Sequence, residues 1–364
     1  MARRLHSIFI TLCAVLISLS ATSAHSINTF QSDPHVNQST SQIAFVSREQ
    51  QGDSLLIIDP VTHTQKLIAQ YPNARIVGIP VWSPDCKFIL VDQIDRNKKY
   101  ITRADVETNP NSQNIIPLQF NLTAYFPKWS PDGKKLLFQA VDFSEGPRNP
   151  DIYTLDVINQ ELVNITHSEE PDADPSWSPD GKRIIFSSIH DGHSNIYQID
   201  ADGSNIQVIY ADPNFENYGP LFSPDGKSIV FASSNKEMGF LKLLNEDKSI
   251  ADLLSEAKGT AAYHAWSPNS QYIAVSTTRP NKKSQLSLID LKPYSVHEIA
   301  NGGMNAIMLF SWSPNSNQIV FQSNQAGHNE IYTIEISSRI ITQLTKTDQD
   351  NLFPSWSPAS CMRQ

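Results

Sequence analysis

The stretch Trp177-Ser178-Pro179-Asp180-Gly181 decides the fold, because versions of it recur through the chain. Successive copies begin 44 to 48 residues apart, at Trp82, Trp129, Trp177, Phe222, Trp266, Trp312 and Trp356. A fixed period means that one supersecondary unit is repeated in series, and periods of about 40 to 50 residues are typical of β-propeller blades. The spacing therefore predicts an all-β propeller.

Each period contains four short β-rich segments separated by turn residues. In the period around Trp129 they are residues 126–130, 136–140, 151–157 and 162–166. Four short antiparallel strands, repeated in series, describe one blade after another.

The strand count predicts seven blades and a particular way of closing the ring. The β-rich run 43–47 has no tryptophan strand before it, whereas the last tryptophan strand, 353–357, has no partner run after it. We expect the C-terminal strand to complete the first blade, which removes the open sheet edges that invite aggregation. The expected propeller spans residues 43–358, with blade 1 shared between 43–70 and 353–358, and a short tail follows at 359–364.

The turn after each tryptophan strand has a clear local cause. Proline presets φ, and the glycines Gly133, Gly181 and Gly226 are able to take positive φ. Blade 5 is irregular, because residues 245–259 carry apolar side chains at helical spacing before a glycine. Both a helical turn inserted beside the outer strand and a degenerate outer strand fit this pattern.

The first 24 residues are predicted to be a secretory signal peptide. Arg3 and Arg4 precede the apolar run 8–19, and Thr22-Ser23-Ala24 offers small residues for cleavage before His25. The run is too short to span a bilayer. We therefore expect an exported protein, periplasmic or secreted, with an N-terminal extension at 25–42.

Charge and hydropathy restrict the possible partners. The formal net charge is −9, and it becomes −11 without the two leader arginines. An acidic surface repels phosphate backbones, so we expect no nucleic-acid partner. No other apolar stretch is long enough to cross a membrane. We expect a monomer with no integral membrane span.

Two cysteines remain after removal of the leader. Cys86 lies in the turn after the blade 2 tryptophan, and Cys361 follows the corresponding blade 1 strand. Neighbouring blades place these turns on the same face, and an exported protein is able to keep a disulfide. A Cys86–Cys361 bond and two free thiols are both open possibilities.

The unit from Trp177 to Asp200, with Asn195-Ile196-Tyr197 after the β run, resembles the WD40-like repeats of TolB-type β-propellers. The resemblance covers residues 43 to 358. It implies a periplasmic protein whose propeller binds protein partners. The family pattern has six blades and a separate N-terminal α/β domain, whereas the repeats here predict seven blades.

Three common sequence signatures of catalysis are missing from the chain. It contains no Gly-x-Ser-x-Gly elbow, no His-Glu-x-x-His helix and no phosphate-binding glycine loop. Related repeats form the propeller half of prolyl-oligopeptidase-type peptidases, which also need an α/β-hydrolase domain; we expect none in this chain and therefore no peptidase activity. We expect a non-enzymatic protein without a cofactor or metal. The alternative is a polysaccharide-active enzyme resembling oligogalacturonate lyases, which place metal-binding histidines around the axial channel. His264 lies on an innermost strand, but its equivalents in the other blades are not metal ligands.

The loops that lead into the innermost strands are the predicted binding site, since a closed ring gathers them around one mouth of the channel. Acidic and aromatic residues there suit a peptide or polar ligand. The candidates are Tyr125, Asp172, Asp174, Asn217, Tyr218, Tyr263, His264, Asp350 and Asn351. Each of them is also compatible with an ordinary role in a turn.

Overall fold

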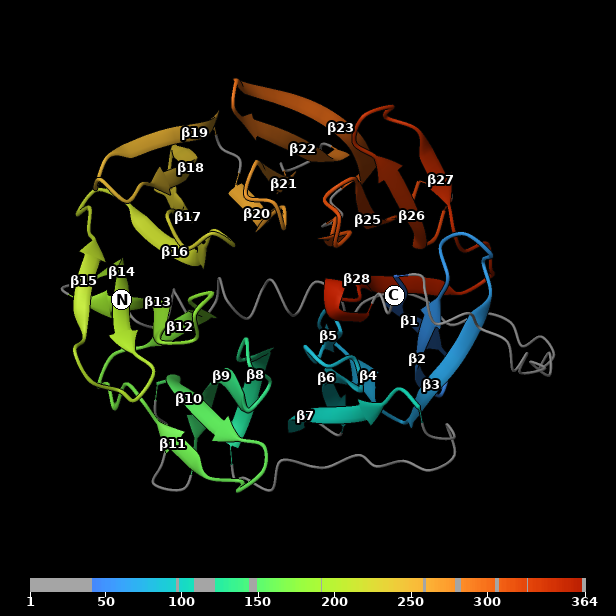
Figure 1. Cartoon of the computed structure of the whole chain (residues 1–364), viewed down its shortest axis with the longest axis horizontal. Coiled ribbons are helices and arrows are strands. Elements are labelled where there is room, and N and C mark those ends of the chain that lie inside the picture. The colour runs from blue at the N-terminus through green and yellow to red at the C-terminus, as the bar shows by residue number, and fades with distance from the viewer. Residues whose placement is uncertain are drawn as a thin grey trace. The chain divides into compact units, whose positions relative to one another are not determined.

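The repeated tryptophan segments form the innermost strands of seven four-stranded antiparallel sheets arranged in a ring (Figure 1). The structure, a computed structural model, describes residues 41–95, 98–107, 122–143, 149–190, 192–257, 260–278, 283–304, 308–325 and 327–361. They belong to one compact unit, Asn37–Gln364. The predicted seven-bladed propeller is confirmed.

The blades, each given from its innermost strand outwards, are as follows. Blade 1 is β28 (Asp350–Trp356), β1 (Ile43–Glu49), β2 (Gly52–Ile58) and β3 (Gln65–Pro72); blade 2 is β4 (Arg75–Ile76) and β5 (Val81–Trp82), then β6 (Phe88–Asp95) and β7 (Lys98–Asp105). Blade 3 is β8 (Leu122–Trp129), β9 (Lys135–Asp142), β10 (Asp151–Asp156) and β11 (Leu162–Asn164); blade 4 is β12 (Asp172–Trp177), β13 (Arg183–His190), β14 (His193–Asp200) and β15 (Gln207–Tyr210). Blade 5 is β16 (Glu216–Phe222), β17 (Ile229–Ser234), β18 (Met238–Leu244) and β19 (Ile250–Ala257). Blade 6 is β20 (Thr260–Trp266), β21 (Tyr272–Thr278), β22 (Lys283–Leu291) and β23 (Tyr294–Met304); blade 7 is β24 (Phe310–Trp312), β25 (Gln318–Ser323), β26 (Glu330–Glu335) and β27 (Ile341–Gln343).

The C-terminal strand closes the ring. β28 pairs with β1 in an antiparallel register that sets Trp356 opposite Ile43 and Ser355 opposite Ala44. The first strand of the described chain and its last strand therefore share one sheet, and β28 covers the edge of β1 that would otherwise be open.

The core lies between the blades rather than within them. Alternate side chains of a strand point to opposite faces of its sheet, so each blade packs one face on the blade before it and the other on the blade after it. Leu137 of blade 3 thus packs with Trp177, Ile184 and Phe186 of blade 4, and all four are buried.

In four of the six tryptophan copies the indole also donates a hydrogen bond to the preceding blade. Trp82 Nε1 donates to Ser355 O at 3.1 Å, and Trp312 Nε1 donates to Ala265 O at 3.2 Å. Trp266 donates to Leu221 O in the same way, at 3.3 Å. In each case the acceptor is the carbonyl one residue before the tryptophan or phenylalanine of the preceding blade. The tryptophan is therefore a contact between blades as well as a core residue.

The serine after the tryptophan explains the recurring turn. Ser178 Oγ donates to Asp180 Oδ1 at 2.5 Å and accepts from Arg183 N at 2.9 Å, which holds the turn closed. The fifth residue has positive φ in six of the seven copies, whereas the copy at Trp356 runs into a 3-10 turn. These residues are Gly133, Gly181 and Gly226, with Cys86 at 65°, Ser270 at 59° and Ser316 at 62°. Left-handed backbone of this kind suits glycine and strains other residues mildly.

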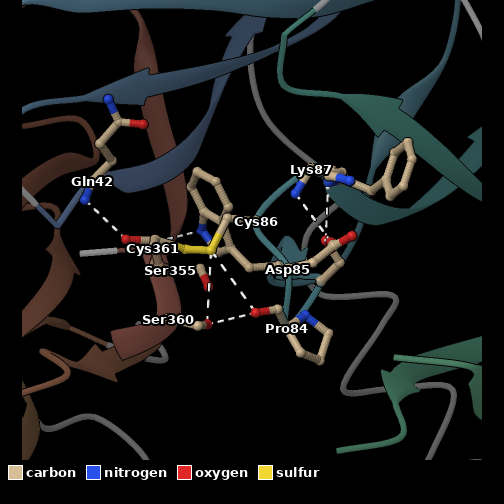
Figure 2. The surroundings of a disulfide bond; sticks show 12 residues. Gln42, Pro84, Asp85, Cys86, Lys87, Ser355, Ser360 and Cys361 are labelled. Carbon is tan, nitrogen blue, oxygen red and sulfur yellow. Dashed lines mark hydrogen bonds between the residues drawn. A yellow bond between two sulfur atoms is a disulfide. The ribbon is translucent and has the colours of Figure 1, made fainter. Parts of the chain in front are cut away.

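Where the fifth residue is not glycine, its side chain contacts the preceding blade. The disulfide is one of these contacts. Ser270 Oγ accepts from Asp225 N at 3.1 Å, and Ser316 Oγ accepts from Asn269 N at 3.1 Å. In blade 2 the corresponding side chain is Cys86, whose sulfur is bonded to Cys361, with 5.6 Å between their Cα atoms (Figure 2). Cys361 follows β28 in a short 3-10 turn (Ala359–Cys361). The covalent link thus lies where blades 1 and 2 meet.

Blade 5 ends in an outer strand and not in a helix. β19 pairs along β18, with a register shift that leaves Leu253 unpaired between Asp252 and Leu254. A bulge adds one residue to a strand and reverses its alternation. Apolar residues three and four apart, which suggested a helical turn, therefore arise from a bulged strand. Residues 258 and 259 lie outside the described part.

The predicted signal peptide, residues 1–24, and extension residues 25–40 also lie outside the described part. Among the described residues, no helix is both long and apolar enough for a membrane crossing.

Candidate binding site on the inner strands

Proline sets the backbone of the inner strands. Five of them carry proline two residues before the tryptophan or phenylalanine. In four of these five the residue before that proline has positive φ: Phe126 (53°), Asp174 (55°), Gly219 (63°) and Phe353 (57°). Proline has no N–H to donate, so the ladder breaks there into a bulge. Where His264 and Phe310 replace proline, the strand pairs with its neighbour at that residue.

The structure places three of the predicted site residues in contacts between blades and buries a fourth, Asp172. Asn217 is fully buried and donates to Ser194 O of blade 4 at 3.1 Å. Asp350 Oδ1 accepts from the backbone N of Asn329 at 2.7 Å, which joins blade 1 to blade 7. Asp172 and Asn351 are each 1% exposed. Asp172, Asn217 and Asn351 therefore lie beyond the reach of a ligand in this conformation, whereas Asp350 is partly exposed.

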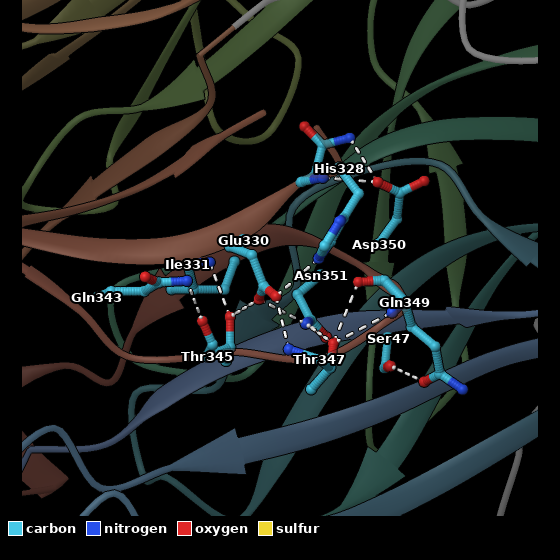
Figure 3. Close-up of polar contacts among 11 residues, drawn as sticks. Ser47, His328, Glu330, Ile331, Gln343, Thr345, Thr347, Gln349, Asp350 and Asn351 are labelled. Carbon is cyan, nitrogen blue, oxygen red and sulfur yellow. Dashed lines mark hydrogen bonds and ion pairs between the residues drawn. The ribbon is translucent and has the colours of Figure 1, made fainter. Parts of the chain in front are cut away.

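Asn351 belongs to a buried polar network around Glu330, shown in Figure 3. The carboxylate of Glu330, 1% exposed, accepts from Asn351 Nδ2 at 2.9 Å, from Thr347 N at 2.7 Å and from the hydroxyl of Thr345. His328 Nε2 lies 3.0 Å from the same carboxylate. The network connects the closing strand β28 to blade 7, so its role is structural.

Tyr263 is also occupied in packing. Its ring meets Phe310 of blade 7 edge to face, with 4.9 Å between centroids. Burial raises the pKa of its hydroxyl to about 12. Tyr263 therefore belongs to the core between blades 6 and 7.

Tyr125 and Phe126 form an aromatic pair on β8. Phe126 is 41% exposed, an unusual value for a residue of an inner strand, and its ring centroid lies 6.4 Å from that of Tyr125. Lys99 of blade 2 places its ammonium 4.3 Å from the Tyr125 centroid, within cation–π range. The backbone at Phe126 is fixed by blade 2, because Phe126 N donates to Asp92 Oδ2 at 2.9 Å.

A second group links blades 4, 5 and 6 through hydrogen bonds. Asp174 Oδ2 accepts from Ser187 Oγ at 3.1 Å and from Gly219 N at 3.2 Å. The carbonyl of Gly219 then accepts from His264 Nε2 at 2.8 Å, since a carbonyl can only accept. Tyr218 is half-buried beside this group and donates to Ser234 Oγ at 3.4 Å. The structure thus brings together Asp174, Tyr218 and His264 from three different blades.

Lys128 adds a positive charge to this group. It lies on β8, directly before Trp129, and its charge acts on the titration of both Asp174 and His264. Burial lowers the pKa of Lys128 to about 8, although Asp174 opposes this change. Burial also raises the pKa of Asp174, against the hydrogen bonds from Gly219 and Ser187. Burial lowers the pKa of His264 to about 4, and Lys128 adds to that effect, so His264 is neutral at pH 7.

Asp92, which accepts the hydrogen bond from Phe126 N, has a shifted pKa. Burial raises its pKa from 3.8 to about 7, opposed by the Phe126 N–H and by Lys99. A raised carboxyl pKa means that the folded state keeps its proton longer than the unfolded state. Stability therefore falls as pH rises from about 4 to 7 and stays at the lower level above pH 7. At the equivalent contacts the acceptor is an uncharged amide. Gln139 of blade 3 accepts from Asp174 N, and Gln322 of blade 7 accepts from Phe353 N.

Replacing Asp92 with asparagine should remove this pH dependence. We expect Asp92→Asn to raise the free energy of unfolding at pH 8 by about 1–4 kcal/mol, and to leave it nearly unchanged at pH 4. Urea unfolding from pH 4 to 8 measures the difference, with exposed Asp348→Asn as the control. A difference between Asp92→Asn and wild type that is the same at every pH would show that Asp92 is not the source.

Lys128, Phe126 and Lys99 were not among the residues predicted from the sequence. A signal for Lys128 was nevertheless present in the repeats. The residue before the tryptophan or phenylalanine is uncharged in every other blade: Val81, Ser176, Leu221, Ala265, Ser311 and Ser355. Phe126 carried no comparable signal, because its exposure follows from the bulge.

The seven-bladed ring with tryptophan-bearing inner strands defines a β-propeller of the PD40 type. The family model described as the TolB beta propeller domain matches residues 39–262. This is more than half of the chain, and the protein belongs to that family.

Individual relatives match either a short part of the sequence or only the fold. The Tol-Pal system protein TolB of Francisella tularensis is 32% identical over 89 residues, which is 24% of this chain and 20% of the relative. The chain therefore matches only about a fifth of that relative's length. TolB from Acinetobacter baumannii shares the fold at a TM-score of 0.52 and 18% identity, over 87% of this chain and 82% of that one. An oligogalacturonate lyase in complex with manganese has a TM-score of 0.68 at 15% identity, over 83% and 87%.

A metal site can be checked on the side chains themselves. Among the residues that the structure describes, no three His, Cys, Asp or Glu side chains are grouped so that they could hold a metal ion. His264 uses Nε2 on the Gly219 carbonyl and is 7% exposed.

Proposed function

We propose that the protein is a non-enzymatic binding module of the cell envelope, exported by its leader, and that the inner strands of blades 3 to 5, together with Lys99 of blade 2, capture a protein or peptide. The observation that carries the proposal is the exposed Phe126 beside Tyr125 and Lys99. Aromatic side chains dominate the binding energy of protein interfaces, and an adjacent lysine adds polar specificity. Asp174 and Tyr218 extend this surface toward blade 5.

The state of His264 supports a binding role over a catalytic one. A general acid or base works best when its pKa lies near the working pH, whereas that of His264 is about 4. Its Nε2 is also engaged by the backbone of blade 5. Membership of the TolB propeller family agrees with a scaffold for partners.

A photo-crosslinking amino acid at position 126 tests the proposal in the native envelope. p-Benzoylphenylalanine is an aromatic replacement for Phe126, so the left-handed backbone is disturbed little. We expect covalent adducts with a partner from position 126 and none from the matched outer position Ile206, which is 54% exposed. No adduct at 126, or equal yields at both positions, would contradict the proposal.

Once a partner has been identified, its affinity for wild type and variants measures how much Phe126 contributes to binding. We expect Phe126→Ala to weaken partner binding about tenfold, or roughly 1.4 kcal/mol, because an interface aromatic is lost. Ile206→Ala should leave the dissociation constant unchanged. Release of unsaturated products from digalacturonate by the purified protein would instead favour the polysaccharide-active alternative.

A further inference from the structure

Asp92 is the ionisable member of a contact that recurs between neighbouring blades. Phe126 N donates to Asp92 Oδ2 at 2.9 Å, whereas the equivalent N–H groups of blades 4 and 1 donate to the side-chain amides of Gln139 and Gln322. A neutral acceptor is therefore sufficient for this contact, and the fold does not require a carboxyl group at position 92. Aspartate adds what the two glutamines lack, a charge that depends on pH.

One oxygen of the Asp92 carboxyl group has no donor. Asp92 is 8% exposed, and its Oδ1 is buried and accepts no hydrogen bond from the described residues. A buried carboxylate with an unsatisfied oxygen is unfavourable, which agrees with the rise of its pKa to about 7. Once Asp92 has lost its proton, an additional donor to Oδ1 would stabilise the anion.

Lys99 is a donor within reach of Asp92. In the antiparallel register of β6 and β7, Ile101 lies opposite Asp92, and Lys99 is two residues away on the same face of the sheet. Diagonal neighbours of this kind are about 7–8 Å apart, a distance that a long side chain can bridge. The Lys99 ammonium lies 4.3 Å from the ring centroid of Tyr125. Lys99 therefore has two alternative partners, the ring of blade 3 and the carboxylate of its own blade.

The other charged side chains on the strands packed around Asp92 act on other groups. They are Arg103 on β7, which lies over the ring of Phe88; Arg75 on β4, which pairs with Asp53; and Lys128 on β8, whose charge acts on Asp174. The charge that acts on the titration of Asp92 is that of Lys99.

We propose that Asp92 and Lys99 form a pH-dependent switch that controls the binding surface around Tyr125 and Phe126. This inference rests on the proposed function, because it assigns a means of regulation to the same surface. At acidic pH Asp92 is neutral, and Lys99 stays over Tyr125, where a partner can contact it.

Ionisation of Asp92 changes the position of Lys99. Asp92 gives its proton to water, and its carboxylate then attracts the Lys99 ammonium. A charge-assisted hydrogen bond to a buried carboxylate is stronger than a cation–π contact with the partly exposed ring of Tyr125, so the ammonium leaves the ring. Partner capture is therefore stronger at acidic pH than at alkaline pH.

NMR of the free mature protein, labelled with 13C, tests the switch without any partner. We expect Asp92 Cγ to titrate near pH 7, and Lys99 Cε and the Tyr125 ring resonances to shift with the same midpoint. Lys99→Met should raise the Asp92 midpoint, because the ammonium that lowers its pKa is lost. Exposed Lys134 is the internal control and should show no shift with this midpoint. An Asp92 midpoint near pH 4, or Lys99 and Tyr125 resonances that do not follow Asp92, would overturn the switch.

The affinity for the partner captured at position 126 measures the regulation. At pH 8, one unit above the pKa of Asp92, about one tenth of the molecules keep Asp92 neutral, so wild type should bind about tenfold more weakly than at pH 6. Asp92→Asn should lose this change, and exposed Asp348→Asn should keep it. Titration of the partner itself affects all variants equally, so the ratio of wild type to Asp92→Asn at each pH isolates Asp92. Asp92→Gln, which copies blades 3 and 7, is the second variant if asparagine impairs folding.

Failure of the switch and failure of the proposed function give different results. If wild type and Asp92→Asn change their affinity by the same factor between pH 6 and pH 8, the switch is wrong and the binding role stands. If position 126 captures no partner, the proposed function is wrong, and the NMR titration still decides whether Lys99 moves when Asp92 ionises.

Discussion

Replacing Glu330 with alanine is expected to lower the free energy of unfolding by about 3–5 kcal/mol. The buried Glu330 carboxylate accepts from Asn351, Thr347 and Thr345, and these donors lie on β28 or on the segment leading to it. Alanine would leave several buried donors without an acceptor, and each unsatisfied group is unfavourable. Because the network connects blade 7 to the closing strand, we expect early exposure of β28. Urea unfolding measures the loss, and hydrogen exchange locates it.

Glu335→Ala is the matched control, since Glu335 ends the same strand and, among the described residues, its carboxylate accepts only a weak contact from Ser337 at 3.4 Å. It should change stability by less than about 0.5 kcal/mol. Glu330→Gln should cause an intermediate loss of stability. The amide keeps one acceptor oxygen, but its NH2 group faces the hydrogen-bond donors that the second carboxylate oxygen accepted from. Equal effects of Glu330→Ala and Glu335→Ala would mean that the network contributes little.

Removing both cysteines with Cys86→Ser and Cys361→Ser should be the next largest loss, about 2–4 kcal/mol. The two residues are 275 positions apart, so the bond closes nearly the whole propeller into one covalent loop. Such a bond restricts the unfolded chain, which is the usual account of disulfide stabilisation. Urea unfolding of the oxidised wild type and the double variant gives the difference.

Reduced wild-type protein is the internal control for this experiment. If the bond alone matters, reductant should bring the wild type to the stability of the double variant and leave the variant unchanged. A wild type that is insensitive to reductant, yet more stable than the variant, would assign the effect to the side chains rather than to the bond.

The ring itself could be predicted from the sequence because every blade repeats the same local rules. Trp177, Ser178 and Gly181 each have a role that is visible in one repeat and reproduced in the others. The unpaired runs at 43–47 and 353–357 likewise indicated that the ends share a blade. Blade 5 was ambiguous, since one bulged residue, Leu253, converts strand spacing into helical spacing.

The candidate site was less predictable, since it depends on contacts between blades. Asp172, Asn217 and Asn351 fall on the face of the inner strand that points to the preceding blade, where they are buried. Asp174 and Tyr218 lie one or two residues away and remain partly accessible. Proline indicates where the bulge lies, but the sequence does not show which side chain the bulge exposes. The binding role of Tyr125, Asp174, Tyr218 and His264 stays a prediction.

The central claim is that the last strand closes the ring beside blade 2 and so gathers the inner strands into one site. Peptide mapping of the unreduced, alkylated mature protein tests it most directly. The structure predicts a single linked pair of peptides within one molecule, containing Cys86 and Cys361. Two alkylated thiols in the folded, oxidised protein, or a bond that joins two molecules, would contradict it.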